Sequence, residues 1–129
     1  MILDTSALLA ILFDEVDADH YEHTINDAMT CQISVANYLE AVLVIESRLG
    51  EEGGRELDNY LEAAEIGLES VTPEQVQAAR LAWRRFGKGN HPAGLNFGDC
   101  FAYALAEVTG EPLLYKGEDF ALTDVESAQ

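Results

Sequence analysis

Four carboxylates in this chain could carry out chemistry if the fold brought them together, although they lie far apart in the sequence: Asp4, Glu40, Asp99 and Asp119. Carboxylate oxygens are the ligands that Mg²⁺ and Mn²⁺ prefer, and these ions also bind phosphate oxygens. Four carboxylates in one cleft would repel one another strongly unless cations occupied it. A converging set would therefore predict a metal site of the kind that cleaves phosphodiester bonds.

Asp4 follows the apolar residues 1–3, which are typical of a short buried strand. Because Thr5 or Ser6 can cap a helix that begins near Ala7, we expect Asp4 at the carboxyl end of that strand. Open α/β sheets bind their ligands at this end. A carboxylate there is a nucleophile, a metal ligand or an ordinary turn residue, and its position alone does not decide among these roles.

Glu40 lies within a predicted helix over residues 35–49, which Gly50 ends as a C-cap. Residues three and four positions away from Glu40 are mostly apolar, so at least one side of it faces apolar neighbours. The alternative is a polar stripe of Asn37, Glu40 and Ser47 that faces water. Helical periodicity leaves both interpretations open.

Asp99 is the third residue of a predicted helix over 97–109 that Asn96 caps. The helix dipole and the cap alone would favour an acid at this position. The residues after Asp99 are almost all apolar, however, so we expect this end of the helix to pack inside the domain. Asp119 follows the apolar residues 113–115, and it too has an ordinary interpretation as a turn residue.

Short apolar strands alternate with helices along the chain, a pattern that predicts βαβ units and a parallel sheet in one α/β domain. We expect strands over residues 1–3, 31–34, 66–71 and 113–115. We expect helices over residues 7–13, 18–29, 35–49, 55–64, 74–86 and 97–109, with a turn at 51–54. Since the carboxyl ends of parallel strands share one edge, Asp4, Asp99 and Asp119 would converge there, and Glu40 could join them from its helix.

Charge and composition exclude several classes of protein. With 48% hydrophobic residues the chain is globular rather than disordered. Seven Lys and Arg against 24 Asp and Glu give a net charge of −17, which argues against a non-specific nucleic-acid binder and suits a protein with a basic partner or a need for metal ions. The longest apolar run, residues 41–45, is too short to span a membrane. Without a secretory signal, and with Cys31 and Cys100 not in a paired motif, we expect a cytoplasmic protein with reduced thiols.

The few basic residues are unevenly distributed, because four of them fall within nine positions: Arg80, Arg84, Arg85 and Lys88. One interpretation is a solvated helix face, or salt bridges to the surrounding acids. The alternative is an edge that follows the phosphates of a nucleic acid and leads through the loop at 87–94 to Asp99.

Four segments together resemble the PIN-domain ribonucleases, and among these they are most similar to the VapC toxins. They are Ile2–Ala7 (Ile-Leu-Asp-Thr-Ser-Ala), the mid-helix Glu40, Leu95–Ala106 (Leu-Asn-Phe-Gly-Asp-Cys-Phe-Ala-Tyr-Ala-Leu-Ala) and Pro112–Phe120 (Pro-Leu-Leu-Tyr-Lys-Gly-Glu-Asp-Phe). Each segment is weak alone, but together they cover essentially the whole chain in order. The resemblance implies one three-layer α/β/α domain over residues 1–129, with a central, mainly parallel sheet of four to five short strands.

The resemblance also implies an endoribonuclease that depends on Mg²⁺ or Mn²⁺, with Asp4, Glu40 and Asp99 as its acidic core. In that scheme Asp4 and Asp99 set the metal, and Glu40 holds a second metal or orients the attacking water. The products would carry a 5′-phosphate and a 3′-hydroxyl. By the same analogy Ser6, rather than Thr5, would hydrogen-bond Asp4 or a water on the metal.

At one position the chain departs from the family pattern, because Gly117 stands where many relatives have an Asp. Asp119 or Glu118 must substitute, or the site uses three acids. We expect Asp119 in a supporting role.

For partners, the resemblance implies a cognate VapB-like antitoxin whose C-terminal segment lies across the active site. It also implies toxin homodimers within a larger toxin–antitoxin assembly, an RNA substrate and no membrane association.

Three other interpretations remain. A catalytically degenerate PIN-like domain could be kept for protein binding alone, although the intact set of Asp4, Glu40 and Asp99 speaks against it. A haloacid-dehalogenase-like phosphatase needs a second Asp two residues after Asp4, where this chain has Ser6. A receiver domain needs a Lys at the end of a late strand, for which Lys116 is the sole candidate.

Overall fold

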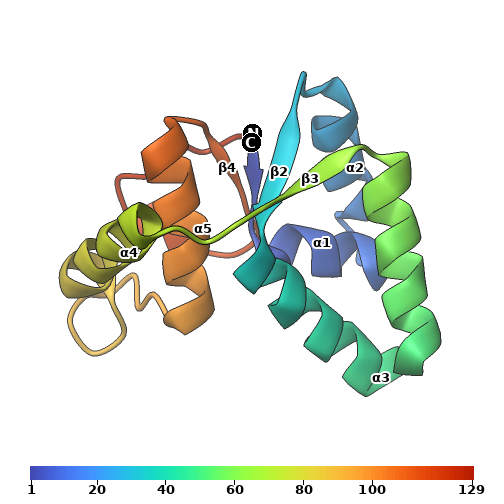
Figure 1. The fold of residues 1–129 in the computed structure, drawn as a ribbon, viewed down its shortest axis with the longest axis horizontal. Coiled ribbons are helices and arrows are strands. Elements are labelled where there is room, and N and C mark those ends of the chain that lie inside the picture. The colour runs from blue at the N-terminus through green and yellow to red at the C-terminus, as the bar shows by residue number, and fades with distance from the viewer.

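A four-stranded parallel sheet forms the centre of the computed structural model, which describes residues 1–129 (Figure 1). The strands are β1 (Ile2–Leu3), β2 (Cys31–Ser34), β3 (Ile66–Glu69) and β4 (Leu113–Leu114), in the order β3-β2-β1-β4. β1 is a central strand that pairs with β2 and with β4, and Ile2 lies opposite both Gln32 and Leu113. Because every pairing is parallel, the carboxyl ends of all four strands lie along one edge of the sheet.

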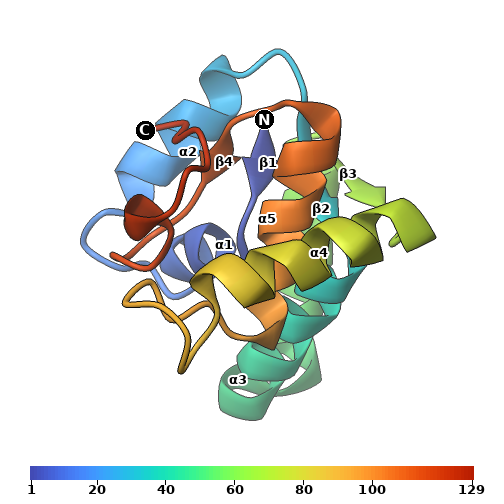
Figure 2. The same cartoon turned by 90° about the vertical axis from the view of Figure 1, so that its left-hand side faces the viewer.

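Helices cover both faces of this sheet (Figures 1 and 2). Helices α1 (Thr5–Leu12), α2 (Ala18–Asp27) and α3 (Val35–Ala63) lie on one side, and α4 (Pro73–Phe86) and α5 (Phe97–Thr109) lie on the other. A short 3₁₀ helix, η1 (Phe120–Leu122), follows β4. The predicted three-layer α/β/α fold is confirmed, with four parallel strands. No helix combines the length and the apolar character that crossing a bilayer requires.

The two-sided burial of the sheet explains why its first strand is apolar throughout. Leu3 belongs to the core cluster that includes residues of α1, α2 and α3, and Ile2 belongs to the cluster formed with α4 and α5. Successive side chains of a strand point to opposite faces, so both faces of β1 must be apolar. β1 therefore carries Asp4 to the sheet edge from a fully buried strand.

The first helix begins earlier than predicted. Thr5 is already helical, and the N-cap is Asp4, which has an extended backbone and whose carboxylate accepts the Ser6 N–H. The prediction that Thr5 or Ser6 caps this helix was therefore wrong, because the carboxylate that ends β1 satisfies the first free N–H of α1. The cap predicted at Ser34 for α3 and the caps predicted for α4 and α5 are confirmed.

The turn predicted at residues 51–54 is absent. Gly50, with a φ of +70°, ends the first helical segment as predicted, but a second segment begins at once and runs to Ala63, so α3 consists of two helical segments joined by a kink at Gly50. Gly53 and Gly54 make this possible, because a Cβ at Gly53 would lie 2.8 Å from Ile45 Cγ2 and one at Gly54 would lie 2.9 Å from Glu46 Cδ. These glycines therefore let the two halves of α3 pack closely, whereas their type alone predicted a loop. Elsewhere, the second helix ends two residues earlier than predicted, at Asp27, and the third strand ends at Glu69 rather than at 71.

Candidate active site

Asp4 is a buried carboxylate without a basic partner. Its backbone N–H donates to Leu114 O at 2.9 Å, which continues the pairing of β1 with β4. The side chain is part of a residue that is only 4% exposed, and none of the ion pairs in the structure includes it. Burial raises the pKa of Asp4 to about 6, and the hydrogen bonds from Ser6 oppose this rise. The fold thus keeps a carboxylate at a place where its negative charge is poorly solvated.

Ser6 holds the Asp4 carboxylate. The Ser6 hydroxyl donates to Asp4 Oδ2 at 2.5 Å, and the Ser6 N–H donates to the same oxygen at 3.0 Å. The Ser6 oxygen in turn accepts the backbone N–H of Lys116 at 2.9 Å. Since Lys116 follows β4 closely, this chain of bonds joins the ends of two adjacent strands around Asp4.

Glu40 projects from the second turn of α3 toward the start of α5. Its Oε1 accepts a short hydrogen bond from the Thr5 hydroxyl and lies 3.4 Å from Asn37 Nδ2. The carboxylate presses against Gly98, where an added Cβ would lie 2.7 Å from Glu40 Cδ. Glycine is therefore required at 98 for this close approach. The interpretation of a water-facing polar stripe is wrong for Asn37, which is fully buried.

Asp99 lies in the first turn of α5, inside the capping box that its spacing from Asn96 predicts. The Asp99 N–H donates to Asn96 Oδ1 at 2.9 Å, and Asp99 Oδ2 accepts the Asn96 N–H at 3.0 Å. Burial raises the pKa of Asp99 to about 7, and the negative charges of Asp4, Asp119 and Glu40 raise it further. The structure therefore brings these acids close enough to repel one another.

Asp119 lies at the rim rather than inside. It is exposed, precedes η1 and makes no capping hydrogen bond, so its influence on Asp99 is the observation that connects it to the acidic core. Glu118 is exposed as well. Gly117 has a φ of +105°, a backbone conformation in which an Asp would be strained. The geometry of this turn thus favours the glycine that the chain has at position 117.

The donor set fits a hard divalent cation, although its side chains are not arranged around one point. No three Asp, Glu, His or Cys side chains converge so as to hold a metal ion as they are oriented here, because Glu40 and Asp99 turn toward Thr5 and Asn96. The donors are nevertheless oxygen only, partly desolvated, mutually repelling and without a basic partner. Such a set suits Mg²⁺ or Mn²⁺, and binding would require Glu40 and Asp99 to rotate toward the ion.

The basic cluster divides into two parts. Arg85 forms an ion pair with Asp124 at 3.0 Å, and its guanidinium lies over the Phe86 ring. Arg80, Arg84 and Lys88 are exposed and form no ion pair. The salt-bridge interpretation therefore holds for Arg85 alone, and the other three cations face solvent.

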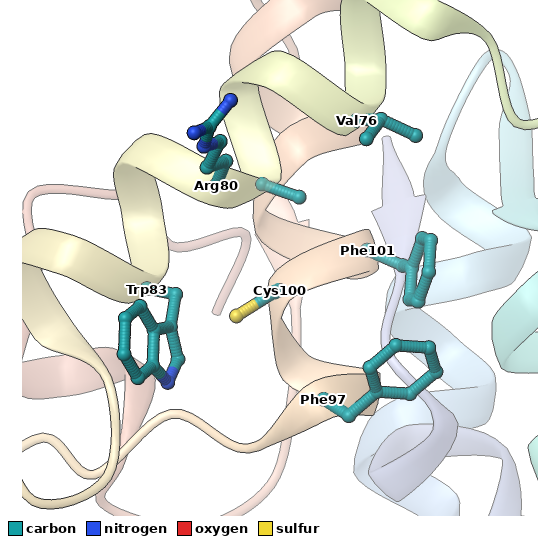
Figure 3. Close-up of a pocket in the computed structure, with 7 residues that line it drawn as sticks. Val76, Arg80, Trp83, Phe97, Cys100 and Phe101 are labelled. Carbon is teal, nitrogen blue, oxygen red and sulfur yellow. The ribbon is translucent and has the colours of Figure 1, made fainter.

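An apolar groove of about 410 Å³ lies between α4 and α5, beside these cations (Figure 3). Trp83 and Arg80 border it from α4, and Phe97, Cys100 and Phe101 border it from α5. A second groove, between α3 and α5, shares Phe97 and Phe101 with the first and reaches Glu40. Phe97 is 80% exposed. The two grooves together form an apolar strip that runs from α4 across α5 to Glu40. Its exposed members include Trp83, Phe97, Leu39 and Leu43.

Sequence reasoning missed two residues that organise the site. Thr5 was considered only as a helix cap or as a lesser alternative to Ser6, yet its hydroxyl contacts Glu40. Asn37 was considered only as part of an alternative surface stripe, yet it bonds to both Glu40 and Gly98. The spacing of three residues from Asn37 to Glu40 was a signal available in the sequence, because such residues are neighbours on one helix face.

Comparison with known proteins places this chain in a described family. Residues 1–126 match the PIN domain family. The chain is 59% identical to a ribonuclease VapC of Mycolicibacterium smegmatis over 97% of each chain. It is 54% identical to ribonuclease VapC30 of Mycobacterium tuberculosis, over 97% of this chain and 95% of that one.

A solved structure shows the same fold. The crystal structure of VapC20 of Mycobacterium tuberculosis, described as a toxin that cleaves the Sarcin-Ricin loop, superposes with a TM-score of 0.78. The match covers 96% of this chain and 95% of that one at 14% identity. At that identity the likeness concerns the fold alone.

Proposed function

The chain belongs to the PIN-domain family, as a homologue of the VapC ribonuclease toxins, and we propose that it hydrolyses RNA with a divalent cation held by Asp4, Glu40 and Asp99. Mg²⁺ is the expected ion, and Mn²⁺ can substitute for it. One observation carries this proposal: the Asp4 carboxylate is buried, has no basic partner and lies close to Glu40 and Asp99. Residues 1–129 act as one domain in this proposal.

Each side chain of the core has a distinct task. A bound divalent cation supplies a Lewis acid for a phosphate oxygen and lowers the pKa of water at the site. Asp4 and Asp99 provide oxygen ligands, and Ser6 fixes the Asp4 carboxylate by two hydrogen bonds. Glu40 orients the attacking water or holds a second ion. Asp119, at the rim, supports Asp99 through its charge.

The substrate enters, in this proposal, along the side of the molecule that carries the exposed, unpaired cations of α4 and of the loop after it. Arg80, Arg84 and Lys88 contact RNA phosphates, since nothing in the fold neutralises them. Arg85 joins them only if it leaves Asp124. In a chain with a net charge of −17, these cations and the bound ion offset part of the repulsion of a polyanion.

The test is cleavage of total RNA by purified protein, freed of any antitoxin, with Mg²⁺ or Mn²⁺ and with EDTA. We expect discrete cleavage that needs the metal and is lost in Asp4→Asn and Asp99→Asn, while Glu62→Gln, at an exposed acid on α3, retains it. Products should carry 5′-phosphate and 3′-hydroxyl ends, because water rather than the 2′-hydroxyl attacks. Ends with a 2′,3′-cyclic phosphate would contradict this mechanism.

The alternative is a catalytically degenerate PIN-like module that acts by binding protein. No cleavage by antitoxin-free wild-type protein in the presence of metal would favour it. The set of Asp4, Glu40 and Asp99 supports the enzyme instead, because a binding module gains nothing from buried carboxylates that repel one another.

We further propose a cognate VapB-like antitoxin and a toxin homodimer as partners, within a larger toxin–antitoxin assembly. The apolar strip supports a protein interface, since Leu39, Leu43 and Phe97 are 55%, 62% and 80% exposed. Light scattering of wild-type protein and of Leu43→Ser tests the homodimer, and we expect the variant to shift toward monomer. Co-expression with the cognate antitoxin should give a complex in which RNA cleavage is suppressed.

A further inference from the structure

Asn37 connects the three elements around the acidic core. It lies in the first turn of α3 and is fully buried. Its side-chain Nδ2 donates to Gly98 O at 2.9 Å and lies 3.4 Å from Glu40 Oε1. Its backbone oxygen accepts the Thr5 hydroxyl at 3.1 Å. One residue therefore contacts α1 beside Asp4, α5 beside Asp99 and the Glu40 carboxylate itself.

The orientation of the Asn37 amide follows from its partners. Both groups near Nδ2 are acceptors, a helix carbonyl and a carboxylate oxygen, so the nitrogen must face them. Oδ1 is then left buried with no hydrogen-bond partner. It is the one buried side-chain polar atom in the chain without a partner.

Stability alone does not explain this asparagine. A buried acceptor without a partner destabilises the folded state. Gly98 O also lies in the first turn of α5, where the helix itself supplies a donor four residues later. An apolar side chain of similar volume would fill the same space without an orphaned oxygen.

We propose that Asn37 is a positioning residue, whose side-chain amide keeps the Glu40 side chain beside the first turn of α5, so that a rotation of the two carboxylates is enough for Glu40 and Asp99 to bind the same cation. It is not itself a ligand. Residues that orient metal ligands typically change metal affinity or activity by about 10–100-fold when they are replaced. The inference rests on the proposed metal-dependent function.

The test compares Asn37→Leu and Asn37→Ser with Asn59→Leu, a control at an exposed position on the same helix. The unfolding temperature is measured in EDTA, and the affinity for Mn²⁺ alone is measured by calorimetry. We expect Asn37→Leu to keep or raise the unfolding temperature of the metal-free protein, while its Mn²⁺ affinity falls by about 10–100-fold. Asn37→Ser should lose a similar factor in Mn²⁺ affinity, and Asn59→Leu should match wild type.

Cleavage kinetics supply a second measurement. Because Asn37 is buried and cannot touch RNA, kcat should fall in Asn37→Leu while KM stays within a few-fold of the wild-type value. Wild-type Mn²⁺ affinity in a folded Asn37→Leu, with or without a lower unfolding temperature, would overturn the positioning role and leave the proposed function intact. Wild-type protein that neither binds Mn²⁺ nor cleaves RNA would overturn both.

Discussion

Two groups of acids in this molecule differ in their surroundings. Glu15 and Asp17 share the ammonium of Lys116, at 2.6 and 3.0 Å, and the hydrogen bond from Lys116 lowers the pKa of Asp17. Asp4 and Asp99 have no such cation, and burial raises the pKa of both. The two groups are joined through the same residue, because the Lys116 N–H donates to Ser6, which holds Asp4.

The comparison shows that proximity of acids is not by itself a functional signal. The group at Lys116 is partly exposed and electrically compensated, as expected of a structural ion pair that contributes little. The group at Asp4 is desolvated and uncompensated, an arrangement that folding alone disfavours. Perturbed carboxylates of this kind concentrate at functional sites. The contrast therefore supports the proposal that Asp4 and Asp99, rather than Glu15 and Asp17, bind a cation.

Removing the Asp4 charge should have the largest effect. Asp4→Asn should lower RNA cleavage by at least about 100-fold and abolish stabilisation by Mn²⁺, because a ligand is lost. In EDTA the same variant should be as stable as wild type or more stable, because a neutral amide avoids the burial of a charge. Thermal unfolding with and without Mn²⁺ measures both effects. A metal-free Asp4→Asn that is much less stable than wild type would show that the charge has a structural partner.

The second-largest effect should be a dependence of the unfolding free energy on pH that arises from Asp4 and Asp99. With pKa values of about 6 for Asp4 and about 7 for Asp99, against 3.8 for the unfolded side chains, the folded state binds more protons than the unfolded state between about pH 4 and pH 7. The metal-free protein should therefore lose stability as the pH rises through this range, by on the order of 3 kcal/mol from Asp4.

Urea unfolding in EDTA across that pH range, for wild type and for Asp4→Asn, isolates the contribution of Asp4. The difference in unfolding free energy between the two should grow with pH, and added Mn²⁺ should reverse the loss in wild type at neutral pH. A difference that stays constant from pH 4 to pH 7 would contradict the raised pKa.

Crowding Glu40 should have an intermediate effect. In Gly98→Ala the new Cβ would lie 2.7 Å from Glu40 Cδ, so the carboxylate must move. We expect cleavage to fall by about 10–100-fold and the free energy of unfolding to fall by about 1–3 kcal/mol. Gly67→Ala is the matched control, because its Cβ would meet no atom closer than 3.6 Å. Full activity in Gly98→Ala would mean that the position of Glu40 is not critical.

The sequence predicted most of the fold because its signals were local. The buried strand before Asp4, the capping box of Asn96 and Asp99 and the left-handed Gly110 after α5 each depend on residues within one or two turns. The helix end at Gly50 was predicted correctly, but the turn at 51–54 was not, because only the tertiary packing of Gly53 and Gly54 shows that these glycines are helical.

The site was harder to predict than the fold, because its organisation depends on contacts between distant segments. The four acids could be named from their types and from a family resemblance, and their roles stay predictions. The contacts of Asn37 and Thr5 join residues 61 and 35 positions apart. No spacing rule reports such pairs, so these two contacts emerged only from the structure.

The smallest effect should come from the compensated group. Lys116→Met removes the ammonium that Glu15 and Asp17 share, but these side chains are partly exposed, so the free energy of unfolding should fall only slightly. Cleavage should stay within a few-fold of wild type, because the Ser6 hydroxyl is held by the backbone N–H of residue 116, which the substitution retains. Urea unfolding at low and high salt measures the first effect, and the small loss should shrink as salt screens the pair. A loss of activity as large as that of Gly98→Ala would mean that the lysine charge itself acts on the acidic core, and that the two groups of acids form one electrostatic unit.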